Sequence, residues 1–179
     1  MSHFAAAVTR GAGSWAAAEL DLSGVADIEE ITDRLRDADP EASVSLLFVE
    51  SDDAYLVILR LDEGEDLRIF GSDVLFAEES RLGAILLGDI EERLPEIAEP
   101  DVDEDEEAEG DEEEDEERPT AEPDIEPAGD PDILSDLGMP SGRLLELCIQ
   151  EGMLPADITA EICQAIGAGD EVEELRESV

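Results

Sequence analysis

The pattern of apolar and polar positions in the first half of the chain predicts a β-sheet with two helices. Runs rich in β-branched, aromatic and other apolar residues alternate with short polar turns, as in strands joined by hairpins. The predicted strands are His3–Thr9, Trp15–Leu20, Ser43–Glu50, Ala54–Leu61 and Asp66–Phe70.

Two segments of this half have helical spacing instead. Asp27 is a candidate N-cap with Glu30 three residues later, and Ile28, Ile31 and Leu35 follow on one face. The second helix is predicted over Ser72–Leu94, where leucines recur along one stripe. The order is ββαβββα, which indicates an α+β fold with a five-stranded, mostly antiparallel sheet.

The last part of the chain, residues 133–179, has only helical patterns and no aromatic residue. Three helices and a last fragment are predicted, each bounded by a capping or stop residue. The boundary residues are Asp130, Pro131, Gly138, Ser141, Gly152, Pro155, Gly167, Asp170 and Glu173. A bundle this small is marginal alone, so we expect it to dock on the N-terminal domain of the same chain or on a partner.

The middle of the chain is strongly acidic. Residues 95–132 hold 21 acidic residues and one arginine, together with regularly spaced prolines. Such a segment cannot bury enough apolar surface to offset its ordering entropy. The sequence therefore predicts three parts: an α+β domain over 1–94, a disordered acidic linker over 95–132 and a helical segment over 133–179.

The charge of the whole chain limits its partners. With 53 acidic and 10 basic residues the formal net charge is −43, which opposes direct binding to nucleic acid or to an anionic membrane. No basic and apolar leader occupies Met1–Gly13, and no apolar run is long enough to span a bilayer. We expect a cytoplasmic protein whose partner is another protein.

The candidate chemical motifs are weak. Gly11-x-Gly13-x-x-Ala16 has the residue spacing of a dinucleotide-binding fingerprint but not its structural context, because no helix of useful length follows it. The single histidine, His3, and the two cysteines, Cys148 and Cys163, are too few and too far apart for a zinc site, and the cysteines read as buried reduced thiols. Asp101, Asp103, Asp105 and Glu112 have calcium-loop spacing, but Glu106 stands where glycine is required.

No serine hydrolase, P-loop or kinase motif is present either. The sequence therefore predicts no catalytic, cofactor-binding or metal-binding residues and no enzyme activity. The two arginines of the last part, Arg143 and Arg176, are outnumbered by ten acidic residues, which disfavours a DNA-reading helix-turn-helix.

Two resemblances add a direction. The order of strands and helices resembles that of longin and roadblock domains, which are binding modules, at the level of topology alone. More specifically, several short motifs are similar to those of the actinobacterial tRNA adenosine deaminase-associated protein family, and the use of arginine for every basic residue fits a GC-rich genome. The motifs are His3–Val8, Trp15, Leu67–Asp73, Ser80–Gly83, Asp132–Gly138 and Leu154–Asp157.

The second resemblance implies an accessory protein, because the family is named for its neighbouring deaminase gene and has no assigned catalytic residues. The chain lacks the zinc motifs of the deaminase itself. We expect a non-catalytic protein that binds the tRNA adenosine deaminase or another basic protein. The alternative is a longin-like or roadblock-like regulatory or dimerisation module unrelated to tRNA. The simplest interpretation of the acidic tract is a solubilising spacer. The more specific alternative is a mimic of nucleic acid that occupies a basic groove on a partner.

Overall fold

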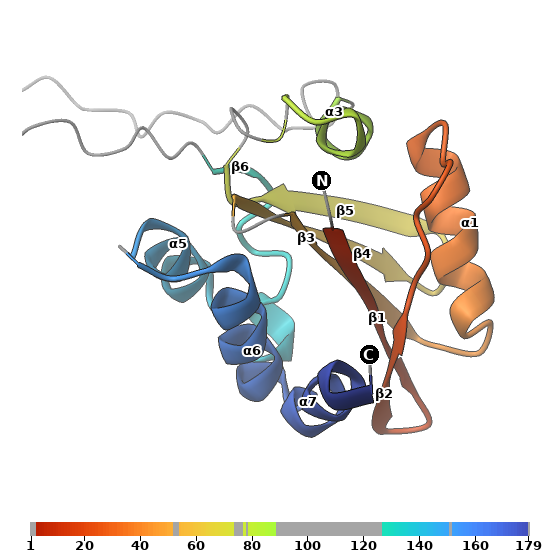
Figure 1. The fold of residues 1–179 in the computed structure, drawn as a ribbon. Helices are drawn as coiled ribbons and strands as arrows, with labels where there is room; N and C mark the ends of the chain where they lie inside the picture. The colour runs from red at the N-terminus through yellow and green to blue at the C-terminus, as the bar shows by residue number, and fades with distance from the viewer. Residues whose placement is uncertain are drawn as a thin grey trace, which may run out of the picture.

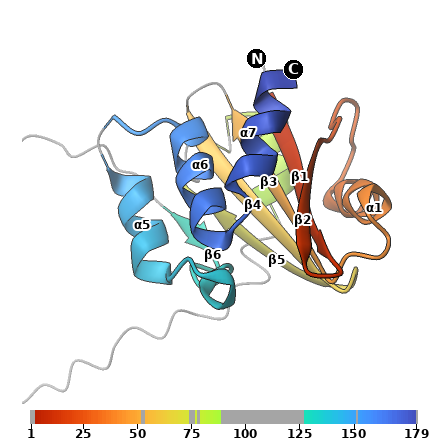
Figure 2. The same ribbon diagram turned by 90° about the horizontal axis from the view of Figure 1, so that it is seen from below.

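The fold is a six-stranded antiparallel sheet with helices packed on both of its faces (Figures 1 and 2). It was analysed in a computed structural model of the full chain. The structure describes residues 3–51, 54–73, 77, 79–88, 127–150 and 152–178. The acidic tract up to residue 126 lies outside the described residues, so the prediction that it is disordered stays a prediction.

The α+β class and the ββαβββα order of the N-terminal part are confirmed. The strands are β1 (His3–Gly11), β2 (Ser14–Glu19), β3 (Val44–Ser51), β4 (Tyr55–Asp62), β5 (Asp66–Gly71) and β6 (Ala128–Gly129). They lie in the order β2-β1-β3-β4-β5-β6, and every neighbouring pair is antiparallel.

The number of strands is corrected from five to six. The additional strand, β6, comes from the end of the predicted linker and pairs with β5, with Phe70 opposite Gly129. Asp130 N donates to the carbonyl of Ile69 at 2.9 Å, which continues the pairing. Gly129 has a φ of +96°, and a Cβ there would lie 2.2 Å from Ile69 O, so this close approach requires glycine.

The first face of the sheet is covered by α1 (Ile28–Ala38) and α3 (Arg81–Leu87). The predicted cap of α1 is confirmed, since the Asp27 carboxylate accepts from Glu30 N at 2.9 Å. Ile31 and Leu35 are fully buried against Leu47, Val57 and Leu59 of the sheet. An amphipathic helix thus buries its apolar stripe on the strand side chains of one parity.

The second predicted helix, Ser72–Leu94, is not one continuous helix. Ala77 is helical and its N–H donates to Asp73 O at 3.3 Å, residues 79 and 80 are not helical, and α3 begins at Arg81; residues 74–76 and 78 lie outside the described part. Ser80 is its N-cap, with its hydroxyl accepting from Gly83 N at 2.9 Å. The residues beyond Gly88 lie outside the described part of the chain. Serine favours a cap over a helix interior because its side chain satisfies a free backbone N–H.

The last part of the chain covers the second face of the sheet (Figure 2). Its elements are the 3-10 turn η1 (Ser135–Leu137), α5 (Ser141–Ile149), α6 (Pro155–Ile166) and α7 (Gly169–Ser178). Ile133, Leu144, Ile158 and Ile162 are buried in one cluster with Phe48 and other sheet residues. Of the two docking alternatives left open by the sequence, the structure shows docking on the N-terminal domain of the same chain.

Some predicted boundaries of these helices are wrong. Asp130 does not cap a helix; its carboxylate accepts from Asp132 N, and the first helical turn is η1. Ser141 is the first residue of α5 rather than its cap, which is Pro140. Pro155 and Gly167 do start and end α6 as predicted, because proline suits a first turn and Gly167 takes a left-handed φ of +92°.

Two arginines join the last part of the chain to the sheet. The Arg60 side chain, 4% exposed on β4, donates to both carboxylate oxygens of Asp136, to the Ile133 carbonyl at 2.7 Å and to Asp62. Arg176 of α7 forms an ion pair with Glu50 on β3 and lies over the Phe4 ring, 4.9 Å from its centroid. Polar contacts as well as apolar burial therefore hold the helices on the sheet.

Candidate functional site

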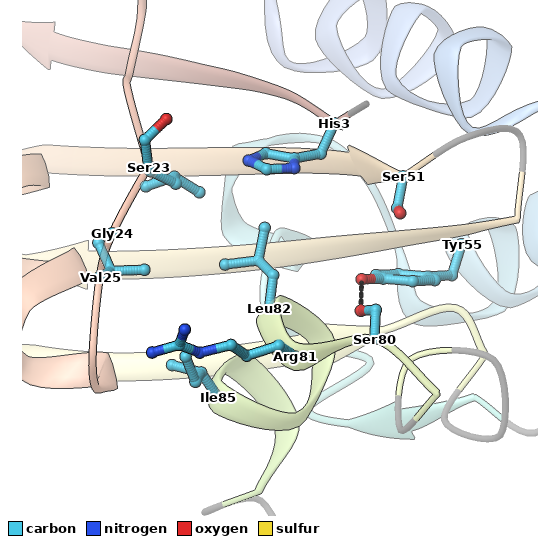
Figure 3. A pocket seen from close by; sticks show the side chains of 11 residues that line it. His3, Ser23, Gly24, Val25, Ser51, Tyr55, Ser80, Arg81, Leu82 and Ile85 are labelled. Atoms are coloured by element: carbon cyan, nitrogen blue, oxygen red, sulfur yellow. Dashed lines mark hydrogen bonds between the residues drawn. The ribbon is translucent and has the colours of Figure 1, made fainter. Parts of the chain in front are cut away.

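A small pocket opens on the α3 side of the sheet, where the ends of several strands meet (Figure 3). Its volume is about 260 Å³. Its walls come from the start of β1, the end of β3, the start of β4, the loop between β2 and α1, and α3. The lining residues are His3, Leu22, Ser23, Gly24, Val25, Ser51, Tyr55, Ser80, Arg81, Leu82 and Ile85.

Local folding rules place these side chains. Leu22 and Val25 are buried because the loop after β2 turns onto the first core. The capping residue of α3, Ser80, also contacts Tyr55, whose hydroxyl lies 2.6 Å from Ser80 Oγ (Figure 3). This contact fixes the start of α3 against β4. The pocket therefore has an aliphatic floor and an ordered phenol on one side.

Two polar groups of neighbouring strands form the upper rim. His3 and Ser51 are cross-strand partners on β1 and β3. His3 is exposed, whereas Ser51 is only 7% exposed. Both side chains line the pocket. No fully buried side-chain polar atom of the described residues lacks a hydrogen-bond partner, so the rim carries no unsatisfied buried group.

The charge of the pocket differs from that of the chain. None of the lining residues that the structure describes is acidic, although 53 of the 179 residues in the chain are. Among the described arginines, Arg81 alone has neither an ion pair nor a ring contact; Arg10, which also lacks an ion pair, lies over Trp15. The nearby Asp21 carboxylate accepts from Ser23 N at 2.8 Å. Hydrogen bonding from the Ser23 side chain and then from its backbone N–H lowers the pKa of Asp21, with a smaller contribution from the charge of Arg34.

The structure separates the single histidine from both cysteines. His3 lines the pocket beside residues of the first core, whereas Cys148 and Cys163 are buried in the second core on the opposite face of the sheet. Burial raises the pKa of each thiol to about 12. A thiol with that pKa is a poor nucleophile at neutral pH, because it holds very little thiolate.

The two thiols should report on docking of the C-terminal helices. In native buffer at pH 8 we expect Cys148 and Cys163 to react with a thiol reagent at least about a hundredfold more slowly than in denaturant, since both are buried and protonated. The measurement is a time course with a chromogenic disulfide reagent. Fast reaction of either thiol in the native chain would contradict the packing of α5 and α6 on the sheet.

The other motifs take structural roles or lie outside the described part. Gly11 and Ser14 flank a two-residue hairpin turn in which Ala12 and Gly13 have φ values of +46° and +90°, and a strand rather than a helix follows. Arg143 faces Glu146 and Glu161. No group of three metal-ligating side chains occurs among the described residues. Asp101, Asp103, Asp105, Glu106 and Glu112 lie outside them.

No sequence pattern indicates this pocket. Its side chains come from five segments spread over residues 3–85, and none of these segments carries a recognisable chemical motif. Two of the segments on which the family resemblance rests, beginning at His3 and at Ser80, meet here. The shared location could have been found only from the pairing of β1 with β3 and from the position of α3.

Comparison with known proteins supports the resemblance. Searches against curated proteins and against solved structures give no significant match to this chain. None of the described helices is long and apolar enough to cross a lipid bilayer. A family model described as "Rv3753c-like tRNA adenosine deaminase-associated protein" matches residues 3–169, almost the whole chain. The chain therefore belongs to the family of tRNA adenosine deaminase-associated proteins.

Proposed function

We propose that the chain is a non-catalytic accessory protein that binds the tRNA adenosine deaminase or another basic, RNA-handling protein. Membership of the deaminase-associated family is the observation that carries this proposal. The N-terminal α+β domain supplies the docking surface. The acidic tract speeds the encounter, because a strongly negative segment attracts a basic surface over a distance set by the ionic strength.

The use of arginine in the folded part supports a protein partner over RNA. Arg34, Arg36, Arg60, Arg143 and Arg176 each face a carboxylate of the same chain. These cations are not free to neutralise phosphates, which supply most of the affinity of nucleic-acid-binding proteins. Binding to a basic protein surface does not need free arginines, because the acidic residues of this chain would make the contacts.

A binding titration against the purified deaminase from the same source tests the proposal. The full chain is compared with a variant in which residues 96–126 are replaced by a Gly/Ser linker of equal length, so that β6 is kept. We expect saturable binding of both chains at physiological salt, with slower association of the variant. Loss of binding with the linker variant would assign the interaction to the tract. No binding at low or physiological salt would overturn the proposal.

Transfer RNA itself is expected not to bind. Because the net charge is −43 and most described arginines are paired, phosphate contacts would be opposed by like-charge repulsion. The measurement is a fluorescence titration of labelled tRNA with the chain alone at physiological salt. Saturable binding there would contradict the proposal of a purely protein partner.

The outer edge of β2 supports a second candidate function, in which the chain is a dimerisation module that pairs with a second copy through this strand. Within the described residues no strand pairs with this edge. Leu20 N donates to Ala5 O, so even-numbered residues of the hairpin point their backbone groups toward β1. The N–H and C=O of Trp15, Ala17 and Glu19 therefore point outward. The strand contains neither proline nor lysine, the residues that often prevent an edge strand from pairing with another chain.

An Ala17→Pro variant of the full chain distinguishes the two functions. Proline removes an outward N–H and leaves the β1–β2 ladder intact, so we expect the folded monomer to be kept and any dimer formed through β2 to be lost. Ala18→Pro, which removes an inward N–H, is the control and should destabilise the hairpin. Sedimentation of both variants against the parent measures this; a dimer that persists in Ala17→Pro does not use this edge.

A further inference from the structure

We propose that the outer edge of β2 accepts an extended, arginine- or lysine-rich segment of the partner protein as an additional strand of the sheet. This inference rests on the proposed function, in which the partner is a basic protein, and it names the surface and the mode of binding. In such strand addition, main-chain hydrogen bonds provide affinity and the side chains of alternate positions provide specificity.

The two edges of the sheet differ in how open they are. The β5 edge is partly covered by β6, and Pro127 and Pro131 flank that short strand, which hinders pairing with a further chain. The β2 edge has no such protection. Within the described residues Trp15, Ala17 and Glu19 direct their N–H and C=O groups outward along the strand with no strand beside them.

On the first face of the sheet, acidic residues border this edge. Ser14 and Ala16 of β2 share a shallow groove with Asp39 and Glu41, which lie between α1 and β3. The Asp39 carboxylate accepts from Glu41 N at 3.1 Å, and neither carboxylate has an ion pair with a described residue. A cation on an added strand would therefore meet two carboxylates that no arginine neutralises.

On the second face, α7 packs beside β2 (Figures 1 and 2). Val172 is buried, and Glu173 and Arg176 line a groove toward α6. Because α6 lies over β3 and β4, the other side of α7 is the one nearer the outer edge of β2. At about 100° of rotation per residue, Glu171 and Leu175 lie on that side, and both are half-buried. An added strand would thus meet a carboxylate and an apolar side chain of α7.

These charges favour a basic strand over a second copy of the chain. The helix α7 holds five acidic residues and one arginine, and that arginine is already paired with Glu50. In a symmetric antiparallel pairing through β2, the two α7 helices would lie side by side on one face, and their like charges would repel. The one arginine of the β1–β2 hairpin, Arg10, lies over the Trp15 ring. A basic segment is attracted on both faces instead.

The experiment is an NMR titration of the full chain at physiological salt with a capped heptapeptide of alternating arginine and valine. Two control peptides are its fully N-methylated analogue, which keeps the charge but donates no backbone hydrogen bond, and the same sequence with glutamate in place of arginine. With the first peptide only, we expect saturable shifts and at least about tenfold slower hydrogen exchange at the outward amides of Trp15, Ala17 and Glu19. Because the readout is resolved by residue, attraction of the peptide to the acidic tract is seen separately.

Three substitutions and a matched control locate the site. Ala17→Pro, which removes the central outward N–H, should weaken binding of the first peptide at least about tenfold. Glu41→Lys and Glu171→Lys, one on each face, should each weaken it several-fold. Glu79→Lys changes the net charge equally, but it lies exposed just before α3, which packs on β5 at the other side of the sheet, so it should bind like the parent.

Several results would overturn the inference. These are no saturable shifts at β2, equal binding of the N-methylated or the glutamate peptide, or equal weakening by Glu79→Lys. Sedimentation of the parent as a dimer that Ala17→Pro abolishes would also overturn it, since a second copy would then occupy the edge.

Titration with the purified deaminase keeps the inference separate from the proposed function. We expect Ala17→Pro to weaken deaminase binding at least about tenfold. Equal binding of the parent and Ala17→Pro would contradict the use of this edge and leave the accessory function standing. If no chain binds the deaminase while the first peptide still pairs with β2, the deaminase is not the partner and the edge remains an acceptor for a basic strand.

Discussion

A chain that ends after residue 94 is expected not to fold as a stable monomer. It would keep β1 to β5, α1 and α3 but lose every element that covers the second face of the sheet. Leu46, Phe48, Leu56, Ile58 and Phe70, each at most 1% exposed in the full chain, would face solvent. Burial of one such side chain is worth about 1.5–3 kcal/mol, so the loss is comparable to the ~5–15 kcal/mol stability of a whole domain.

Circular dichroism, size-exclusion chromatography and binding of a hydrophobic dye to residues 1–94 measure this effect. The control is the full chain with the Gly/Ser linker at 96–126, which should keep the parent's cooperative unfolding. Residues 127–179 added as a separate peptide should restore folding of the fragment. A soluble, cooperatively unfolding monomer of residues 1–94 would show that the second face needs no cover.

The same observation affects how dimerisation is tested. A dimer formed by residues 1–94 alone could arise through the uncovered face rather than through the edge of β2. Only the full chain, in which α5 to α7 occupy that face, reports on the edge. The Ala17→Pro test is therefore designed in the full chain.

The sequence predicted best what neighbouring residues determine. The start of α1 follows from Asp27 and Glu30, three residues apart, and its face from Ile31 and Leu35. The β1–β2 hairpin follows from the turn residues Gly11 to Ser14, although the loop has two residues, Ala12 and Gly13, rather than the four to five that the strand bounds suggest. In each case the interaction that forms the element lies within a few positions of the chain.

Elements that depend on distant partners were missed or incomplete. Strand β6 is two residues long and has no periodic pattern, and it exists only because β5 offers a free edge. Docking of the C-terminal helices did have a signal. The runs Leu46–Val49 and Tyr55–Leu59 are apolar at both parities, so both faces of the sheet needed a cover.

The candidate site could not be predicted from the sequence, for a different reason. Its character comes from the aliphatic side chains that line it and from Arg81, which has no acidic partner among the described residues. In a chain with 53 acidic residues, no sequence pattern shows which arginine is left without one. Only the folded arrangement of side chains reveals it.

Asp136→Ala is expected to be the most destabilising single substitution of an exposed carboxylate. The Asp136 side chain is 57% exposed, but its partner, the Arg60 side chain, is 4% exposed. The substitution leaves a buried guanidinium with only Asp62 and the Ile133 carbonyl. We expect a loss of about 2–3 kcal/mol in the free energy of unfolding, because an incompletely paired buried charge is costly.

Asp33→Ala is the matched control, since Asp33 pairs with Arg36 at 2.5 Å but both side chains are about half exposed or more. Exposed ion pairs contribute about 0–1 kcal/mol, so this variant should unfold almost like the parent in urea. The pH dependence gives a second check. Arg60 lowers the pKa of Asp136 below its ordinary 3.8, so the stabilisation is complete above that pH and is lost as the pH falls through the folded-state pKa. Equal effects of the two substitutions at neutral pH would show that the contact between Arg60 and Asp136 does not hold the last part of the chain on the sheet.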